Sequence, residues 1–280
     1  MVALGSVRSC AVTTLALCLA STWPSRPDAS GRRVLLVEAD PAGGTLAAAS
    51  GWAAEPSLVS LAAAARRGAD PELVFEHCQA LPGGTAVLAA PAAPEQSRAA
   101  LGMAQRLLAR LGELDADVIV DCGRLDPGSP VMPAVAGTDR LLVAVRPRLA
   151  DLHATATWLA ARPLADVPVA LVAVGDGPYP DAEIAEALGV EVVARLPWDP
   201  DAAEALVAVP ASTRRLRLAP LVRTARTLAE HLSRRRGAQP EAEAVPPKAA
   251  GRLGRRVLAP WRGEPAAVSA DASATNGLSR

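Results

Sequence analysis

The sequence predicts an α/β fold in which a mostly parallel β-sheet is flanked by helices. Short continuous runs of Val and Leu, typical of strands buried on both faces, recur along the chain. Between them lie helical patterns, some amphipathic and some rich in alanine. The 280 residues are 50% hydrophobic but only 2% aromatic, so the core must be built mainly from Ala, Val and Leu. Strands that alternate with helices of this length form right-handed parallel β-α-β units.

The first element is expected within GSVRSCAVTTLALCLAS (residues 5–21), a short polar stretch followed by an apolar one. An apolar run that ends in small residues is also typical of an export signal. Against that alternative, the segment has Arg8 as its basic side chain, and Thr13 and Thr14 interrupt the run. The run is also too short to span a bilayer. The segment therefore predicts either the first helix of the fold or a removed signal.

The expected strands share a continuous apolar run. The clearest is Val34–Val37, within RRVLLVEADPAGG (residues 32–44), where the run ends in acids and a Pro-Ala-Gly-Gly turn. The other expected strands are 117–121, 140–145 and 167–174, with weaker examples at 85–90 and 190–196. Ligands of such sheets bind at the carboxyl ends of the strands. We therefore expect a site to be formed by the loops after residues 5, 37, 120 and 145.

The clearest expected helix lies within residues 95–114, where Leu101, Ala104, Leu108 and Leu111 recur at spacings of three and four. Further helices are expected at 57–68, 150–163 and 180–189. From about Gly237 the composition changes to Ala, Pro, Gly, Glu and Ser without periodicity. We therefore predict a folded domain over 1–236 and a disordered tail over 237–280.

Charge and cysteine content exclude several classes of protein. The formal net charge is +0, so the chain as a whole is not a polyelectrolyte that binds nucleic acid. The cysteines have neither C-x-x-C spacing nor neighbouring histidines, which favours buried free thiols over disulfides or a zinc site. They are Cys10, Cys18, Cys78 and Cys122. No partner pattern surrounds His77, His153 or His231, and we expect these to be ordinary packing or surface residues.

Four segments, in order, resemble the ParA/MinD family of P-loop ATPases, the deviant Walker A group of the SIMIBI class. VRSCAVTT (7–14) stands where the family has Lys-Gly-Gly-x-Gly-Lys-Thr-Thr, and RVLLVEADPAGG (33–44) where it has Arg-Val-Leu-Leu-Val-Asp-x-Asp-Pro-x-Gly. DVIVDCG (117–123) is similar to its Walker B strand, and RLPWDPDAAEAL (195–206) to its late Ile-Pro-x-Asp-Pro segment. The resemblance covers 1–236 and implies a Rossmann-like P-loop fold in which residues 5–21 contain the first helix.

The resemblance implies a phosphate-binding loop, but a degenerate one. The implied cofactor-binding residues are Arg8, Ser9, Cys10, Ala11, Val12, Thr13 and Thr14. Aligned on Thr13-Thr14, the family's two lysines fall on Val7 and Val12, and its three glycines on Arg8, Ser9 and Ala11. Lysine neutralises the β- and γ-phosphate oxygens, and Lys248, in the tail, is the chain's lysine. Binding of ATP or ADP with Mg²⁺ is therefore expected to be weakened, and ATP hydrolysis to be unlikely.

Part of the implied site survives. The helix N-terminus attracts anions without a lysine. Thr13 keeps the metal-facing hydroxyl, Asp40 lies where the switch I aspartate places metal or water, and Asp121 lies where the Walker B aspartate holds Mg²⁺. Thr13, Asp40 and Asp121 are thus the implied magnesium residues, and Asp40 the catalytic candidate. Structural alternatives remain: a strand-ending turn for Asp40, a cap or buried hydrogen-bonding carboxylate for Asp121, and a solvated loop charge for Arg8.

Two other positions depart from the family. Glu38 takes the place of the first aspartate of the Asp-x-Asp pair, which keeps the charge but lengthens the side chain. Gly175 and Asp176, in AVGDGPYP (173–180), stand where the family often carries an asparagine that reads adenine. The sequence therefore leaves purine recognition open.

Two basic segments are candidate partner surfaces. Residues 212–236 are rich in arginine, and from Pro220 onward their apolar residues form one stripe at Leu221, Ala225, Leu228 and Leu232. ParA-like relatives hold DNA nonspecifically through basic surfaces; a packing helix with a solvated face is the alternative. Residues 248–263 mix basic and apolar side chains and could contact an anionic membrane, although glycines and Pro260 favour a partner-binding peptide or a linker.

The sequence thus predicts a cytoplasmic, degenerate ParA/MinD-like protein, either nucleotide-binding or a pseudo-ATPase. It would act in positioning or partitioning of a chromosome, septum or pilus machinery, as a homodimer or with a protein partner, with peripheral contact to membrane or nucleoid left open. One alternative is an active Mg-ATP-dependent dimerising switch in which Arg8 or a partner supplies the missing charge. The other is an exported globular protein whose first twenty-odd residues are removed.

Overall fold

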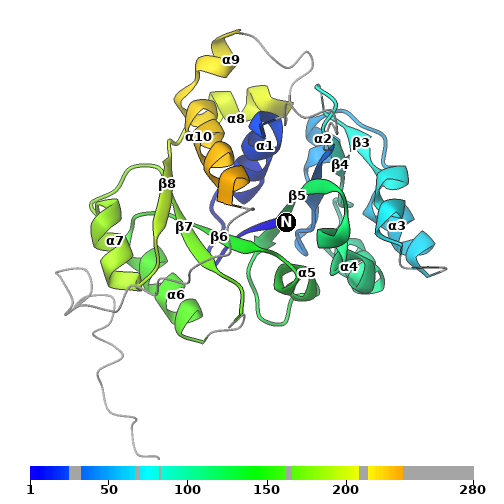
Figure 1. The fold of residues 1–280 in the computed structure, drawn as a ribbon, viewed down its shortest axis with the longest axis horizontal. Helices are drawn as coiled ribbons and strands as arrows, with labels where there is room; N and C mark the ends of the chain where they lie inside the picture. Colours follow the sequence, from blue (N-terminus) through cyan, green and yellow to red (C-terminus); the bar gives the residue numbers. More distant parts are fainter. Residues whose placement is uncertain are drawn as a thin grey trace, which may run out of the picture.

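The computed structural model consists of one sheet with helices on both faces (Figure 1). It describes residues 1–24, 33–66, 68, 70–81, 83–161, 166–207 and 214–235. The strand order is β3-β4-β2-β5-β1-β6-β7-β8, and all neighbouring strands are parallel except the antiparallel pair β3 and β4. The strands are β1 (Val2–Ser6), β2 (Arg33–Glu38), β3 (Gln79–Ala80), β4 (Ala86–Leu88), β5 (Ala116–Arg124), β6 (Arg140–Val145), β7 (Val169–Val174) and β8 (Val192–Leu196). The predicted α/β class is confirmed.

The helices form two layers, one on each face of the sheet. The α-helices are α1 (Val12–Thr22), α2 (Leu46–Ala49), α3 (Leu58–Ala65), α4 (Pro94–Leu108), α5 (Met132–Ala136), α6 (Leu149–Ala160), α7 (Asp181–Leu188), α8 (Pro200–Val207), α9 (Arg214–Leu218) and α10 (Pro220–Arg235), with 3-10 helices η1 (Pro71–His77) and η2 (Leu111–Glu113). Helices α1, α8 and α10 pack on one face, and α3 to α7 on the other. The helix expected within 95–114 ends at Leu108 because the chain turns there and continues as η2.

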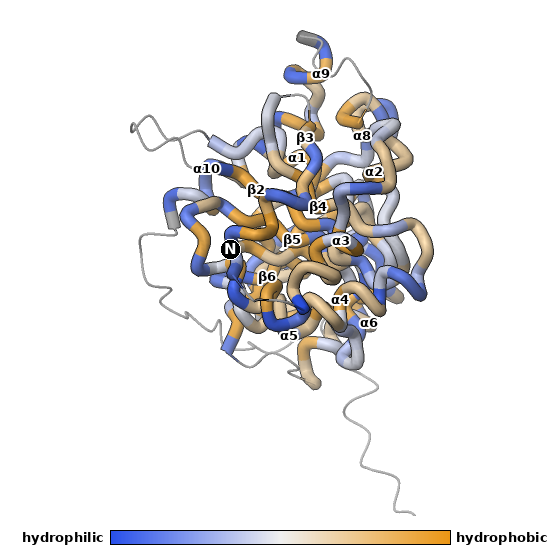
Figure 2. The backbone as a smooth tube through the Cα atoms, turned by 90° about the vertical axis from the view of Figure 1, so that its right-hand side faces the viewer, coloured by the Kyte–Doolittle hydropathy of each residue, from blue (hydrophilic) through white to orange (hydrophobic). Residues whose placement is uncertain are grey.

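Both faces of the central strands are buried, which explains their continuous apolar runs. In β2, Leu36 joins the core under α1 and α10, whereas Leu35 and Val37 join the core under α3 and α4. Fully burying one leucine side chain contributes roughly 1.5–3 kcal/mol, so the inner strands hold much of the stability. Figure 2 shows hydrophobic residues along β5 and β6, in the interior of the molecule.

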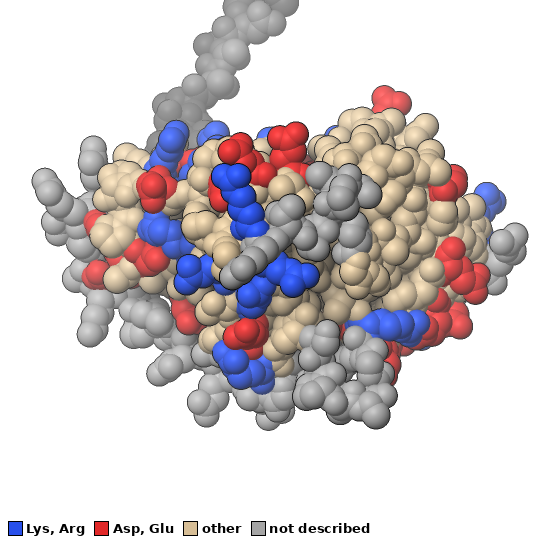
Figure 3. Space-filling model, turned by 90° about the horizontal axis from the view of Figure 1, so that it is seen from above, with Lys and Arg blue, Asp and Glu red and all other residues tan. Residues whose placement is uncertain are grey.

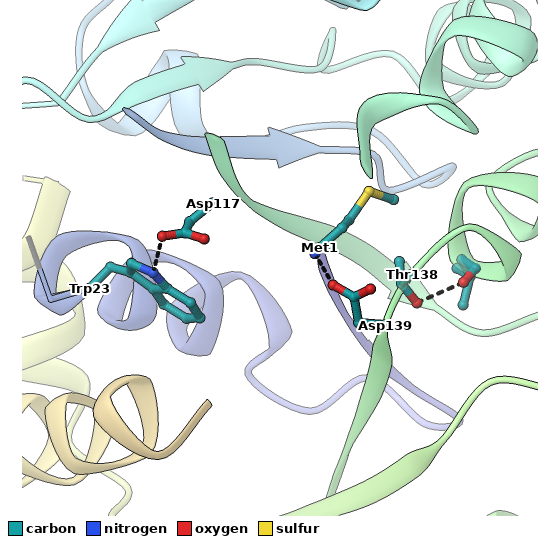
Figure 4. A network of polar contacts seen from close by, with 6 residues as sticks. Met1, Trp23, Asp117, Thr138 and Asp139 are labelled. Atoms are coloured by element: carbon teal, nitrogen blue, oxygen red, sulfur yellow. Dashed lines mark hydrogen bonds and ion pairs between the residues drawn. The ribbon is translucent and has the colours of Figure 1, made fainter. Parts of the chain in front are cut away.

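The apolar segment at the start of the chain belongs to the interior of the fold. All five residues of β1 are buried, and the strand lies between β5 and β6. Helix α1 packs on α10 (Figure 1). Polar contacts fix the amino end of β1 and the carboxyl end of α1: the Met1 amino group pairs with Asp139, and Trp23 Nε1 donates to Asp117 Oδ2 over 2.9 Å (Figure 4). A chain without residues 1–21 would lack a central strand and a buried helix.

The apolar stripe predicted for 212–236 is confirmed within α10. Leu221, Ala225, Leu228 and Leu232 are all buried, while Arg223 and Arg226 are exposed. This stripe packs against α1 and the neighbouring face of the sheet. The tail at 237–280, with the basic segment 248–263, lies outside the described residues. In the part of the chain that is described, no helix has both the length and the hydropathy needed to cross a membrane.

A candidate nucleotide site at the carboxyl edge of the sheet

The loop at residues 7–11 joins β1 to α1 at the carboxyl edge of the sheet, where chain connections diverge to either side of β1. Ligands of open α/β sheets bind at such a point. Ala11 caps α1 with φ 45° and ψ 31°, a left-handed conformation. It is the one positive-φ residue other than glycine in the described ranges. An alanine there costs about 1–2 kcal/mol relative to ordinary backbone, so the tight turn is formed at the expense of strain.

Two of the loop's side chains face the interior. Cys10 is 4% exposed and Val12 is 6% exposed, and both join the apolar core around α1. They can offer a ligand only their backbone groups. Arg8 and Ser9 are exposed, and Thr13 and Thr14 are half-buried on the first turn of α1. The position that the resemblance assigns to the phosphate-binding lysine is thus an apolar side chain turned into the core.

Asp121 lies near the start of α1 and is fully buried within the carboxyl-terminal half of β5. Its Oδ1 accepts the Gly123 N–H at 3.0 Å. Burial raises the pKa of Asp121 to about 7, an effect that Thr13 and Gly123 oppose through hydrogen bonding and that Glu38 and Asp40 reinforce. Its Oδ2 is buried without a partner at full hydrogen-bonding geometry. An orphaned carboxylate oxygen beside the Thr13 hydroxyl offers the hard oxygen ligands that Mg²⁺ prefers.

Glu38 is the strand neighbour of Asp121, and it has a different role. Its Oε1 accepts the N–H groups of Thr45 at 2.7 Å and Leu46 at 3.1 Å. Its Oε2 accepts the N–H of Ala90 at 2.9 Å. Burial raises the pKa of Glu38, and these backbone hydrogen bonds lower it. The glutamate therefore ties the start of α2 to the loop that follows β4.

The backbone around Glu38 leaves no room for another side chain. A Cβ on Gly44 would lie 2.3 Å from Glu38 Oε2 and 2.5 Å from the Ala90 carbonyl oxygen. Both carboxylate oxygens of Glu38, the longer acid that departs from the family pattern, are thus occupied by hydrogen bonds within the protein.

Asp40 comes close to Asp121 from the end of β2. Its Oδ1 accepts the N–H of Ala42 at 2.7 Å, which is the strand-ending turn considered from the sequence. A Cβ on Gly123, whose φ is +57°, would lie 2.1 Å from the Asp40 carboxyl carbon, so only glycine fits beneath this side chain. Burial raises the pKa of Asp40, while Arg124 and Arg98 lower it. Thr13 and Asp40 therefore both lie near Asp121.

The sequence reasoning missed Arg124 and Arg98. Arg124 ends β5, and its Nη2 donates to Ser9 Oγ in the loop at 3.0 Å. Arg98 lies in α4 and also acts on Asp40. Arg124 follows Asp121 by three positions in a stretch that departs from the family pattern. A basic residue just past the end of a central strand is the signal that would have found it.

A pocket of about 430 Å³ opens beyond the ends of β6, β7 and β8. It is lined by Arg146, Arg148, Val174, Gly175, Asp176 and Trp198. The pocket lies beside the loop in the order of the sheet, because β6, which Arg146 directly follows, pairs with β1. Burial raises the pKa of Cys10 in that loop to about 11, and the charge of Arg146 opposes this shift. Trp198 is 61% exposed, among the few large hydrophobic side chains at the described surface. From the sequence, only Gly175 and Asp176 were singled out here.

Solved structures share this architecture. A ParA family ATPase from Chlorobium tepidum TLS aligns with a TM-score of 0.67 at 20% identity, covering 82% of this chain and 98% of that one. The septum site-determining protein MinD from Pyrococcus horikoshii OT3, complexed with Mg-ADP, aligns at 0.63 and 16% identity, covering 86% and 98%. This chain has the ParA/MinD fold. No family model and no curated protein matches its sequence.

A third structure extends the ParA/MinD comparison to a biosynthetic enzyme. Cobyrinic acid a,c-diamide synthase from Mycobacterium smegmatis, with bound ATP analogue and magnesium, aligns with a TM-score of 0.57 at 18% identity. The alignment covers 88% of this chain and 98% of the synthase. The shared fold thus occurs in P-loop ATPases with different biological roles, and the chemistry of this chain must be argued from its own residues.

Proposed function

We propose that this chain is a nucleotide-binding protein of the ParA/MinD fold, with little or no nucleotide hydrolysis, that acts in the cytoplasm as a positioning or scaffolding factor. The proposal rests on one observation: the residues suited to hold magnesium lie together, but the loop has no cationic side chain at the lysine position. Thr13, Asp40 and Asp121 gather at the start of α1, yet Val12 turns an apolar side chain into the core. The machinery served would be that of a chromosome, septum or pilus.

The phosphates of a nucleotide would bind the backbone of the 7–11 loop and the N-terminus of α1. This end of the helix carries about half a positive charge from its unpaired N–H groups. Thr13 and Asp121 would hold Mg²⁺, with Asp40 beside them. The magnesium would supply charge neutralisation at the phosphate oxygens. Asp121 Oδ2 fits this use, because it is buried with no partner at full hydrogen-bonding geometry, and a buried polar group that is not well hydrogen-bonded is costly to the folded protein.

Slow hydrolysis follows from the charges at the loop. Phosphoryl transfer depends almost entirely on electrostatic stabilisation of the γ-phosphate. Arg124 is held against Ser9 and supplies one cation, but a planar guanidinium on a neighbouring strand is not equivalent to a lysine within the loop. The contact between Arg124 and Ser9 also favours a second candidate function. In that alternative the protein is an active Mg-ATP-dependent switch, and Arg124 supplies the positive charge that the loop lacks.

A homodimer or a protein partner is part of the proposal. A MinC:MinD cell division protein complex from Aquifex aeolicus shares the fold, with a TM-score of 0.57 at 14% identity and coverage of 83% of this chain and 94% of that one. DNA binding is not part of it. In the face shown in Figure 3, basic side chains gather near the middle with acidic side chains beside them, rather than as an uninterrupted basic field.

The test is nucleotide binding and turnover by the full chain. We expect saturating Mg-nucleotide to raise the melting temperature by about 5 °C or more. Phosphate release should stay at background, measured beside an active P-loop ATPase. No shift with any nucleoside diphosphate or triphosphate would refute the proposal. Steady turnover that Asp40→Asn and Asp121→Asn both abolish would replace it with the active switch.

A further inference from the structure

The pocket beside the phosphate loop has a fixed rim. A Cβ on Gly177 would lie 2.4 Å from the Pro147 carbonyl oxygen, and one on Gly175 would lie 3.5 Å from Trp198 Cβ. The segment that carries Asp176 therefore packs closely against Pro147 at the end of β6, and it lies at ordinary van der Waals distance from Trp198. Its place in the pocket is set on this side by the close approach of Gly177 to the Pro147 backbone.

Arg195 holds the same segment from β8. Its Nη1 donates to the Gly175 carbonyl oxygen at 3.0 Å, and its Nη2 donates to the Tyr179 carbonyl oxygen at 3.0 Å and to Asp181. A site whose polar groups are held in place before binding loses less entropy when a ligand arrives. Asp176 is thus presented by a braced segment.

The pocket also offers a stacking surface. The exposed ring of Trp198 is a face on which any nucleobase can stack. The Arg146 guanidinium lies 5.9 Å from the centroid of that ring, compared with 3.7 Å for Arg33 over Phe75 elsewhere in the chain. The arginine therefore lies over the ring at the outer limit of a cation–π contact, which leaves its donors available to a base in the pocket.

The polar groups of the pocket favour one purine over the other. An ionised Asp176 only accepts hydrogen bonds, and Arg146 and Arg148 only donate them. Guanine carries the acceptors O6 and N7 on one edge, which arginine recognises with paired donors. It carries N1–H and the 2-amino group on the adjacent edge, and a carboxylate can accept from both. Adenine has an amino donor in place of O6 and lacks the N1–H and the 2-amino group, so it satisfies this set only in part.

We propose that this pocket selects a guanine base, so that the ligand of the site is a guanine nucleotide. The assignment rests on the proposed nucleotide-binding function and goes beyond it by naming the base. Trp198 stacks the base, the arginines donate to O6 and N7, and Asp176 accepts from N1–H and the 2-amino group. Asp176 is the specificity-determining residue.

The experiment is a calorimetric titration of the full chain with Mg-GDP, Mg-ADP and Mg-IDP. Inosine diphosphate lacks only the 2-amino group of GDP. We expect GDP to bind about tenfold or more tightly than ADP, with IDP in between. Asp176→Asn, whose amide can pair with adenine, should remove or reverse the preference for GDP. Trp198→Ala should weaken GDP and ADP binding together. The control Asp201→Asn makes the same chemical change at an exposed residue outside the pocket and should leave every affinity unchanged.

The outcomes separate this inference from the proposed function. Equal affinity for GDP and ADP, or a preference for ADP, overturns the guanine assignment and leaves nucleotide binding intact. A preference for GDP that Asp176→Asn does not alter overturns the role of Asp176. If no nucleoside diphosphate binds, both the assignment and the proposed function fail. Asp176 and Trp198 are exposed, so the variants should keep the wild-type melting temperature, which is measured first.

Discussion

Glu38 and Asp121 lie opposite each other in neighbouring strands, at the same depth and on the same face of the sheet, and their environments differ. Glu38 accepts three backbone N–H groups, one of them from Ala90 at the end of β4. Asp121 keeps one buried oxygen without a partner at full hydrogen-bonding geometry. Burial of an acid is therefore a poor sign of function by itself. The informative feature is whether the surrounding chain satisfies every oxygen.

The largest expected effect is the loss of the Glu38 carboxylate. Glu38→Ala leaves three N–H groups without their partner, and each such group costs about 1–3 kcal/mol when buried. We expect the free energy of unfolding to fall by about 3–5 kcal/mol, measured by urea denaturation. Glu38→Gln keeps one acceptor oxygen and should lose about half as much. A loss below about 1 kcal/mol for the alanine variant would show that Glu38 is not a structural tie.

Asp121→Asn should have the opposite effect on stability at neutral and higher pH. In the folded protein the pKa of Asp121 is raised to about 7 from 3.8. The folded state therefore binds this proton more tightly than the unfolded state does. The contribution of the protonated Asp121 to the free energy of unfolding is fully present below about pH 4. It is lost as the pH rises to about 7, by up to about 4 kcal/mol. The asparagine variant should lack this slope in denaturation series recorded in EDTA. The asparagine variant should also lose the magnesium dependence of nucleotide binding, measured by calorimetry with and without Mg²⁺. If the stability of the wild type and the variant depends on pH in the same way, Asp121 is not the group whose pKa is raised.

A smaller effect is expected on nucleotide affinity when Arg124, the cation that contacts the 7–11 loop from β5, is removed. Arg124→Gln removes the guanidinium that contacts Ser9, and charged hydrogen bonds contribute about 1.5–3 kcal/mol. Nucleoside diphosphate affinity should fall about tenfold or more in calorimetry. Arg8→Gln is the matched control, because Arg8 is the exposed loop arginine that the sequence offered as a substitute. A larger loss in the Arg8 variant would exchange the roles of the two arginines.

The smallest effect concerns the left-handed alanine. Ala11→Gly relieves about 1–2 kcal/mol of backbone strain but increases the freedom of the unfolded chain, which offsets about half of that gain. We expect a net stabilisation of about 0.5–1 kcal/mol, seen as a small rise in melting temperature. A destabilised glycine variant would mean that the strain at Ala11 is compensated by packing of its methyl group.

The fold could be predicted because its signals are local. The apolar runs at 34–37, 117–121, 140–145 and 167–174 correspond to β2, β5, β6 and β7, with ends shifted by a few residues. Thr13 and Asp40 follow β1 and β2, and Asp121 lies in the carboxyl-terminal half of β5, so all three are near the same edge of the sheet. The topology alone places such residues at a common edge.

The remainder of the site depends on contacts between distant parts of the chain. The role of Glu38 requires the N–H of Ala90, 52 positions away, and no periodicity reports that pairing. Arg124 meets Ser9 across 115 positions. Trp198 and Arg146 come from loops whose directions are set by packing of the outer strands. Helix α2 and the 3-10 helix η1 were missed because short elements carry too few residues for a periodic pattern.

The position of β1 also has a consequence for synthesis. Residues 2–6 leave the ribosome long before their partners in β5 and β6, which begin at residues 116 and 140. This buried strand, which the apolar helix follows, therefore cannot be paired on both sides until residue 145, the end of β6, has been made. Such long-range parallel pairing is slow, and apolar surface that is prone to aggregation stays exposed until it forms. We expect the nascent chain to depend on chaperones, and a circular permutant beginning at residue 83, which places β5 and β6 ahead of β1, to fold faster than the natural order.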